Sequence, residues 1–523
     1  MAHLGLALAE SGLPVSTSSQ LMTEPETGVE PVASVGIEKR SSFASDVLKL
    51  VGGTVMAQVI TILTAPILSR LYAPEAYGTL AIFVSIVSII SVIVCMRYEV
   101  AIMLPGKDED AVNLLALSFM IAFVVSGLSA ILILIGHQSI VNLLKAPCLL
   151  PYLWLVPVAL LVQGVFQALN YWNSRLKRFE ALSIARVSAS VTTSAVPLAL
   201  GAIGRASTGA LVGSWMAGTT VFTTILGGQL WRDTQRQFRD HVRLHRIAES
   251  LKRYRKFPLV DSWATFINNI SWQLPALMLS AFFTQTVVGY YSLANRVIML
   301  PLTLVGSSIG QVFFQRASEA RGNSDDLSKI VQVVFRQLVA LGLFPSILLT
   351  IAGKELFAVV FGSNWAEAGV YAQILSPWVF VLAISSPLST LFSVLERQEL
   401  SLILNVFILT SRIASLMIGG ALGDVYIALA LWSGTGISVY GGLAIWNMTL
   451  AGVSLTLALR IVLKYILYSI PALAIFLVVK TYFQTPIWTV VVAAAVSIIV
   501  YYSLILYYDR ALYRNLTLSL TKR

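Results

Sequence analysis

A single arginine stands inside a long apolar stretch of this sequence, which runs from Val287 to Arg316. The stretch exceeds the roughly 20 residues that a helix needs to cross a bilayer, and Arg296 lies near the depth of the bilayer midplane. A charge at that depth costs at least about 2.5 kcal/mol, so we expect it to face protein or water instead of lipid. The other polar residues of the stretch are spaced to share its helical face. They are Ser292, Thr303, Ser307 and Gln311.

Such a face predicts a helix that lines a cavity and presents a cation to it. The alternative is a structural arginine that pairs with main-chain carbonyls or with an acid in a packed bundle. Pro301 also lies inside the stretch, so we expect the helix to bend there.

Further charged residues lie within or at the ends of apolar segments, and cations outnumber acids among them. An arginine-rich cavity suits an anionic ligand, because the guanidinium fork matches the oxygens of a phosphate or pyrophosphate. We therefore list these residues as candidates for binding an anionic substrate. They are Arg70, Arg97, Arg186, Arg296 and Arg412, with the acid Glu99 beside them; Arg336 is a further arginine inside a predicted span.

One acid lies on a polar helical face near the predicted cytoplasmic end of its span. Asp261 shares that face with Thr265, Asn268 and Trp272, at spacings of four, three and four residues. An acid in this position is a candidate for proton or Na⁺ coupling. The alternative is a helix-start acid that faces cytoplasmic water.

The whole chain has the composition of an all-α polytopic membrane protein. It has 523 residues, of which 57% are hydrophobic and 12% are charged, and its mean hydropathy is +0.80. We predict about 14 transmembrane helices, as two lobes of six at 43–230 and 257–452 and two more within 453–523. Residues 1–42 are predicted to be a disordered cytoplasmic tail, and 231–256 a basic cytoplasmic linker.

The connections between the predicted spans differ in charge from one side to the other. Lysine and arginine on one side outnumber those on the other about five to one, alternating loop by loop. The positive-inside rule then places both termini and the linker in the cytoplasm. The net charge of +11 belongs to these loops, so we expect no nucleic-acid partner.

A weak internal repeat supports two lobes. A shift of 211 residues places Leu68-Ser69 on Leu279-Ser280 and Gly78 on Gly289. Six spans separate the equivalent points, and six is even. The two lobes would therefore have the same orientation and be related by an axis along the membrane normal.

Motifs for covalent or metal chemistry are missing from the sequence. It has no G-x-x-x-x-G-K-[ST] nucleotide-binding loop and no H-E-x-x-H zinc motif. Two cysteines and four scattered histidines are too few for a haem or a multi-cysteine metal site. We therefore expect no enzyme, no metal and no cofactor, apart from proton or Na⁺ coupling.

Three stretches of the sequence resemble a known family. They are Leu71–Gly78, Arg97–Pro105 and Gly289–Arg296. Over roughly residues 43–450 the chain is similar to the bacterial polysaccharide transporters. These are the oligosaccharide flippases of the multidrug/oligosaccharidyl-lipid/polysaccharide (MOP) exporter superfamily.

The resemblance implies two six-helix lobes in a V-shaped, MATE-like arrangement around a cationic cavity. It also implies that undecaprenyl-pyrophosphate-linked oligosaccharide crosses the bacterial inner membrane for O-antigen, lipopolysaccharide or exopolysaccharide synthesis. Arg97, Glu99 and Arg296 match functionally implicated positions of the family. The family's further cation in the second lobe has no clear match in this chain, and Arg412 is the candidate for it. The implied partners are the lipid-linked oligosaccharide and membrane lipids, with a polysaccharide polymerase and chain-length machinery as further candidates.

Two other functions remain as alternatives. A cation-coupled multidrug antiporter of the same superfamily would need acids in the cavity, whereas arginines dominate here. A membrane polysaccharide polymerase or ligase would need a large periplasmic loop, and the predicted non-cytoplasmic loops are all short. We therefore favour the flippase.

Overall fold

The computed structural model describes residues 43–302, 306–320, 323–394, 398–482 and 488–509. Contacts group Ala44–Arg523 into one unit, and of the other unit, Met1–Phe43, only the last residue is described. The predicted tail at 1–42 therefore lies outside the described residues, and so does the predicted cytoplasmic end at 510–523.

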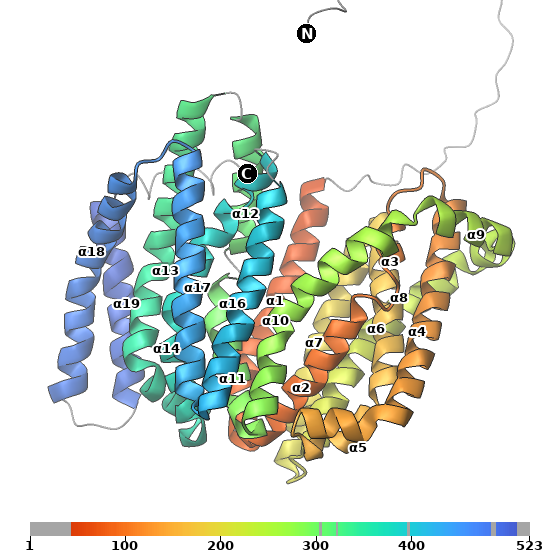
Figure 1. Cartoon of the computed structure of the whole chain (residues 1–523), viewed down its shortest axis with the longest axis horizontal. Helices are drawn as coiled ribbons and strands as arrows, with labels where there is room; N and C mark the ends of the chain where they lie inside the picture. Colours follow the sequence, from red (N-terminus) through yellow and green to blue (C-terminus); the bar gives the residue numbers. More distant parts are fainter. Residues whose placement is uncertain (1–42, 303–305, 321–322, 395–397, 483–487, 510–523) are drawn as a thin grey trace, which may run out of the picture. The chain divides into compact units, whose positions relative to one another are not determined.

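All regular elements in the described ranges are helices, without a strand among them (Figure 1). The N-terminal half comprises α1 (Phe43–Leu71), α2 (Pro74–Ser91), α3 (Tyr98–Ala101), α4 (Asp108–Leu143), η1 (Pro147–Leu149), α5 (Leu150–Leu153), α6 (Val156–Arg175), α7 (Phe179–Ala202) and α8 (Thr208–His241). It is followed by α9 (Leu244–Arg253) and by the π-helical turn η2 (Phe257–Asp261).

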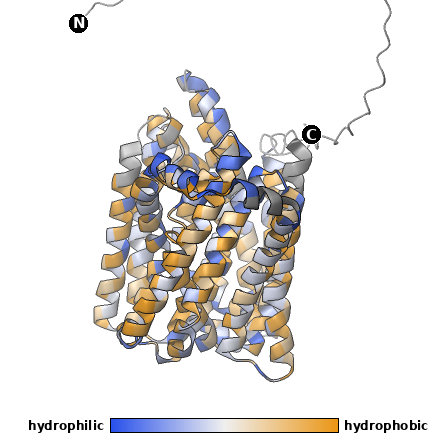
Figure 2. Ribbon diagram, turned by 90° about the vertical axis from the view of Figure 1, so that its right-hand side faces the viewer, coloured by the Kyte–Doolittle hydropathy of each residue, from blue (hydrophilic) through white to orange (hydrophobic). Residues whose placement is uncertain are grey.

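The C-terminal half comprises α10 (Ser262–Phe282), α11 (Gln285–Pro301), α12 (Ser307–Glu319), α13 (Ser324–Phe361), η4 (Ser363–Trp365), α14 (Ala366–Leu388), α15 (Leu391–Val394), α16 (Gln398–Leu422) and α17 (Val425–Leu450). Two further helices, α18 (Leu455–Tyr482) and α19 (Trp488–Tyr508), end the described chain. The helix bodies are mostly hydrophobic, and hydrophilic residues gather toward one end of the bundle (Figure 2).

Eleven described helices are long and apolar enough to cross a membrane, and α5 with α6 gives a twelfth span if counted across its 56° bend. The prediction of an all-α, multi-pass membrane protein is confirmed, but the total of 14 is not. The two remaining predicted spans fall on α10 and on α11 with α12, which do not meet the same test. α10 is rich in polar residues, and α11 has only 17 residues, of which Pro301 is the last. The sequence predicted a bend at Pro301, and the next helix, α12, begins at Ser307.

The two halves meet where α2 packs against α11, and the contact is between main chains. A Cβ atom on Gly78 would lie 1.8 Å from the carbonyl oxygen of Gln285, and one on Gly289 would lie 2.0 Å from that of Pro74. Only glycine allows so close an approach. Gly78 and Gly289 are the pair that the 211-residue shift superimposes, so the repeat positions lie against each other.

Two hydrogen bonds fasten the halves in a reciprocal way. Ser69 on α1 donates to the carbonyl of Phe361 at 2.9 Å, and Ser280 on α10 donates to that of Leu144 at 2.6 Å. Each acceptor lies at the end of a long helix of the opposite half, α13 and α4 respectively. Ser69 and Ser280 are again equivalent under the shift of 211 residues.

The predicted linker at 231–256 is largely helical and is attached to the N-terminal half. In α9, Arg246 Nη1 lies 3.0 Å from Glu109 Oε2, Ile247 is buried, and the carbonyl of Leu251 accepts from the Tyr98 hydroxyl at 3.0 Å. The sequence predicted only a basic cytoplasmic linker here. The apolar contacts of Ile247 show that α9 also packs against protein.

A buried acid holds the last two helices in place. Asp509, 1% exposed at the end of α19, accepts from the Tyr465 hydroxyl at 2.8 Å and from Lys464 at 3.1 Å. It also forms an ion pair with Arg336 of α13. Arg336 thus has a structural partner, as expected for an arginine inside a membrane bundle.

Candidate functional site: an arginine cavity and a hydroxyl cavity

Arg296 of α11 lines a cavity of about 170 Å³, which we call the arginine cavity. The other walls come from α1, α2, α7 and α8. The Arg296 side chain lies deep in the bundle, where α11 packs against α2 and α14, and it is accessible through this cavity. Tyr77 interacts with it electrostatically. Among the described residues, no acid forms an ion pair with its guanidinium group. Such a cation inside a membrane protein is available to an anionic ligand.

A second cavity of about 350 Å³, the hydroxyl cavity, adjoins the first, since Thr61, Thr193 and Trp215 line both. Its walls come from α1, α6, α7 and α8. Hydroxyls, aromatic rings and small side chains dominate the linings, and no acid occurs among the described lining residues of either cavity. The two adjoining spaces therefore form an acid-free region that carries hydroxyl groups on largely apolar walls beside Arg296.

Hydroxyl pairs join α1 to α7 along the wall of these cavities. The Oγ1 atom of Thr61 lies 3.1 Å from Ser190 Oγ, and Thr64 donates to Ser194 Oγ at 3.1 Å. One turn before Ser190, Arg186 Nη1 donates to a threonine hydroxyl of α1 at 2.7 Å. Arg186 thus joins α7 to α1 close to these cavities, but it lines neither of them. Its role in substrate binding stays a prediction.

Arg97, Glu99 and Asp261 lie together where the two halves meet. Arg97 Nε donates to Asp261 Oδ2 at 2.7 Å, and Arg97 Nη1 lies 3.7 Å from Glu99 Oε1. Asp261 ends the π-helical turn η2, a conformation that is frequent at functional sites. Met96 and Arg97 have left-handed φ angles of 51° and 62°, which are uncommon outside glycine. The sequence predicted separate roles for Arg97 and Asp261, and the structure brings them into one cluster.

Glu99 is almost fully buried in this cluster, at 1% exposure. Its Oε2 atom has no hydrogen-bond partner among the described residues. Burial raises the pKa of Glu99 to about 7, with Arg97 acting to lower it and Asp261 to raise it. A carboxyl with such a pKa can change its protonation near neutral pH, so Glu99 joins Asp261 as a candidate for proton coupling.

Arg412 of α16 is 2% exposed and enclosed by indole rings. Its guanidinium carbon lies 5.1, 5.9 and 5.5 Å from the ring centres of Trp272, Trp378 and Trp432. It also donates to Ser271 Oγ at 3.0 Å. These contacts hold the cation among aromatic rings, while its buried Nε atom has no hydrogen-bond partner among the described residues. Arg412 lines neither the arginine cavity nor the hydroxyl cavity. Its part in substrate binding remains a prediction.

Arg70, the remaining candidate, belongs to the contact between the halves. Its Nη2 atom donates to the carbonyl of Val359 at 2.7 Å, near the Ser69–Phe361 hydrogen bond. It does not line either cavity. The structure therefore gives Arg70 a partner in the closed end of the bundle and leaves its binding role untested.

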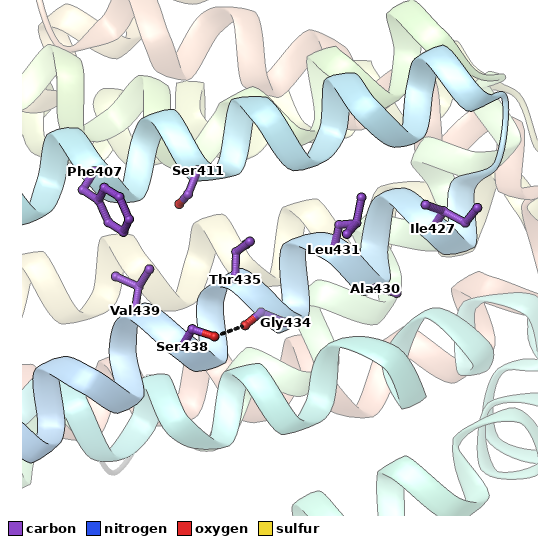
Figure 3. Close-up of a pocket in the computed structure, with 9 residues that line it drawn as sticks. All are labelled: Phe407, Ser411, Ile427, Ala430, Leu431, Gly434, Thr435, Ser438 and Val439. Atoms are coloured by element: carbon purple, nitrogen blue, oxygen red, sulfur yellow. Dashed lines mark hydrogen bonds between the residues drawn. The ribbon is translucent and has the colours of Figure 1, made fainter.

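A groove of about 650 Å³ lies between α16 and α17 (Figure 3). Its described lining carries no charge and is largely aliphatic, with Phe407, Ile427 and Leu431 along it. The hydroxyl of Ser438 is turned to its own helix, where it donates to the carbonyl of Gly434 at 2.9 Å. This lining suits hydrocarbon and not an ion.

The polar face predicted around Arg296 is described only in part. Ser292 donates to the carbonyl of Gly289 at 2.9 Å, and the side chains of Thr303, Ser307 and Gln311 lie outside the described residues. In the part of the chain that is described, no group of three His, Cys, Asp or Glu side chains could hold a metal ion.

Sequence reasoning missed most residues of the hydroxyl cavity. Ser190, Thr193, Thr219 and Trp215 were not candidates, because single hydroxyls in apolar helices are ordinary. A usable signal did exist: Ser188–Ser194 holds five hydroxyl residues within one predicted span. Which of them face inward depends on the neighbouring helix α8, and one helix alone does not reveal that.

Comparison with known proteins gives the family. Residues 67–370, more than half of the chain, match the model of a family described as polysaccharide biosynthesis protein. The lipopolysaccharide biosynthesis protein WzxC of Escherichia coli (strain K12) is 26% identical over 183 residues. That match covers 34% of this chain and 36% of WzxC, so it spans little more than a third of that relative's length.

Two solved structures show the fold. The lipid II flippase MurJ, in an inward closed conformation, matches with a TM-score of 0.70 at 13% identity and covers 90% of this chain and 99% of its own. An inward-facing multidrug resistance MATE transporter of the MOP superfamily matches with a TM-score of 0.60 at 14% identity, over 76% and 94%. The chain is therefore a multi-pass membrane protein with the fold of MOP transporters, and it belongs to the polysaccharide biosynthesis protein family.

Proposed function

We propose that this protein is a flippase for oligosaccharide linked to undecaprenyl pyrophosphate, acting in the bacterial inner membrane in O-antigen or exopolysaccharide synthesis. Arg296 carries the proposal. It is a cation inside the bundle, exposed to a cavity, without an acidic partner among the described residues. Of the anionic groups that a membrane lipid presents, a phosphate is the one that a guanidinium fork fits best.

The family match supports a glycan as the other part of the cargo. WzxC is named for lipopolysaccharide biosynthesis, and MurJ for flipping a lipid. A lipid-linked glycan combines an anionic phosphate with a neutral polar head. The arginine cavity and the acid-free hydroxyl cavity offer places for these two kinds of group.

Transport by alternating access needs contacts between the halves that can open at either end. The Ser69–Phe361 and Ser280–Leu144 hydrogen bonds close one end. At the α3–η2 junction, the Arg97–Asp261 ion pair joins the halves. We propose that the transport cycle opens these two sets of contacts in turn, while the pyrophosphate stays near Arg296.

We propose that the α9 end of the bundle faces the cytoplasm. The carboxyl end of α19 lies at the same end as α9 (Figure 1), and the most basic connection of the chain is there. Reporter fusions at Asp240 should be active in the cytoplasm, and fusions at Gln138 should be active in the periplasm. A periplasmic signal at Asp240 would reverse the orientation.

A multidrug antiporter of the same superfamily is the second candidate, since its fold is also matched. Such a protein needs a place for an organic cation, and neither cavity has an acid among its described lining residues. The indole cage that would attract a cation is filled by Arg412 of the chain itself. These contacts favour the anionic cargo.

We propose transport without covalent chemistry, with a polymerase and chain-length machinery as later recipients of the cargo. The experiment is deletion of the gene in its own host, followed by mass spectrometry of lipid-linked sugars. A flippase mutant accumulates complete glycan units on undecaprenyl pyrophosphate at the cytoplasmic face. A mutant without such accumulation, and with unchanged surface polysaccharide, would rule out this function.

A further inference from the structure

The hydroxyl cavity presents hydrogen-bond acceptors to its interior. Ser190 donates to the carbonyl of Ala57 at 2.7 Å, Thr193 to that of Ser190 at 3.0 Å and Thr219 to that of Trp215 at 3.1 Å. A hydroxyl has one proton and two lone pairs. Because the main chain takes the proton in each case, lone pairs remain to accept from a ligand, although the Ser190 hydroxyl also lies 3.1 Å from that of Thr61.

Aromatic rings stand beside these acceptors. Trp215 lines both cavities, and its ring meets Phe83 edge-on with 5.8 Å between centres. Phe166 and Phe222 line the hydroxyl cavity, and their ring centres lie 4.6 Å apart. Flat apolar faces next to oxygen acceptors fit a molecule with an apolar face and a rim of hydroxyl donors.

Charge is separated between the two cavities. Among the described lining residues, the hydroxyl cavity has no charged side chain, whereas the arginine cavity holds Arg296, which only donates hydrogen bonds. The hydroxyls of this lining can accept from a sugar's hydroxyl groups, and Gln163 and the Trp215 indole N–H add neutral donors, but the lining offers no cation to pair with an anion. A phosphate would therefore stay near Arg296, and a neutral, hydroxyl-rich group would enter the hydroxyl cavity.

The sizes and the connection of the cavities agree with this division. The hydroxyl cavity, at about 350 Å³, is within the range of roughly 300–1,000 Å³ that is usual for small-molecule sites. It adjoins the arginine cavity, with which it shares the lining residues Thr61, Thr193 and Trp215. In a glycan pyrophosphate, the group bonded directly to the phosphate is the first sugar.

We infer that the hydroxyl cavity is a binding site for the first sugar of the lipid-linked glycan and that it selects an uncharged one. Trp215 supplies the stacking face, and the hydroxyls of Ser190, Thr193 and Thr219 accept from the sugar's hydroxyl groups. The inference rests on the proposed function, because it assumes a pyrophosphate held at Arg296.

The test measures the binding of two probes to the full-length protein in lipid nanodiscs. One probe is undecaprenyl pyrophosphate without sugar, and the other carries a single neutral hexose. Thr193→Val and Thr219→Val keep the side-chain shape and remove the acceptor. Thr192→Val and Thr220→Val are matched controls, because these threonines make the same kind of main-chain bond and line neither cavity.

We expect Thr193→Val and Thr219→Val each to weaken binding of the sugar-bearing probe about fivefold or more. Binding of the sugar-free probe should stay unchanged, and so should both affinities of the control variants. Trp215→Ala should act like the cavity variants, with Trp215→Phe restoring part of the loss. This set of results would support the sugar site.

Two results would overturn the inference in distinguishable ways. Wild-type protein that binds both probes equally, with cavity variants that change neither, removes the sugar site and leaves the flippase intact. Wild-type protein that binds neither probe removes both proposals. A cavity variant that weakens the binding of both probes alike would show that Thr193 or Thr219 supports the fold instead of contacting the sugar, which also contradicts the sugar site.

Discussion

Arg97 Nε lies 2.7 Å from Asp261 Oδ2, and this ion pair joins the connection after α2 to the turn that begins α10. The two residues are 164 positions apart in the chain and belong to opposite halves. The Arg97 side chain is 23% exposed and that of Asp261 44%, so water reaches the pair and weakens it. A contact of this strength can be broken and remade during a transport cycle.

Exchanging the two charges of this pair should restore part of the polysaccharide export that reversing either charge alone removes. We expect Arg97→Asp and Asp261→Arg each to reduce export by placing like charges together. The double variant should recover about two- to fivefold, as expected for a partly exposed pair worth up to about 1 kcal/mol. The measurement is the amount of surface polysaccharide in the deletion strain when it produces each variant. A double variant no better than either single variant would mean that the two charges act separately.

Glu99 should make stability depend on pH. Burial raises its pKa to about 7 from 4.5, so the folded protein holds this proton more tightly than the unfolded chain. Between these values the unfolded carboxyl ionises first. Stability should therefore fall as pH rises through this window, by about 3 kcal/mol in all, and level off above it.

The measurement is the thermal unfolding midpoint in detergent from pH 4.5 to 8. Glu99→Gln, which carries no titrating proton, should show a flatter profile than wild type and should be the more stable protein at pH 8. Two profiles with the same slope would show that Glu99 is ionised in the fold at all these pH values.

Substitution at the α2–α11 crossing should be poorly tolerated. Gly78→Ala or Gly289→Ala would push a methyl group against a carbonyl oxygen, so we expect a loss of about 1–3 kcal/mol. Gly213→Ala is the control, since a Cβ atom there meets nothing within 4 Å. The measurement is the thermal unfolding midpoint of each purified variant, compared with that of the wild type. Equal midpoints for all three variants would contradict the close approach of α2 and α11.

The last two helices should loosen when Asp509 loses its charge. Burial acts to raise the pKa of Asp509, and the bonds from Arg336, Tyr465 and Lys464 outweigh it and lower the pKa to about 2. Asp509→Asn should cost about 1–3 kcal/mol, because these donors lose their ionised acceptor. Asp240→Asn, at an exposed site, is the control.

Limited digestion with trypsin at Arg460 and Lys464 of α18 reports the change, because Lys464 donates to Asp509. We expect faster cleavage in Asp509→Asn than in wild type or Asp240→Asn. Unchanged cleavage would show that apolar packing alone holds α18 and α19.

Features that stand out in the sequence itself could be predicted without a structure. Arg296 is a charge in an apolar run, and Gly78 and Gly289 are equivalent in the repeat, so both were accessible without a structure. The cage around Arg412 was not, because Trp272, Trp378 and Trp432 come from α10, α14 and α17.

The hydroxyl cavity shows a second limit of the sequence. Thr192 and Thr193 are neighbours with the same chemistry, and only the second lines the cavity. Their roles are set by how α7 rotates against α1 and α8. That rotation follows from packing between helices, such as the fit of Gly218 against Thr193, and not from the pattern of α7.

The rate of polysaccharide export by Arg296→Ala, divided by the amount of the variant in the membrane, tests the cationic-cavity mechanism most directly. A buried charge-assisted contact is worth roughly 1.5–3 kcal/mol, so we expect the rate to fall at least about tenfold. Arg296→Lys should be intermediate, since lysine keeps the charge and loses the bidentate fork. An Arg296→Ala protein that reaches the membrane normally and exports glycan at the wild-type rate would contradict the role given to Arg296.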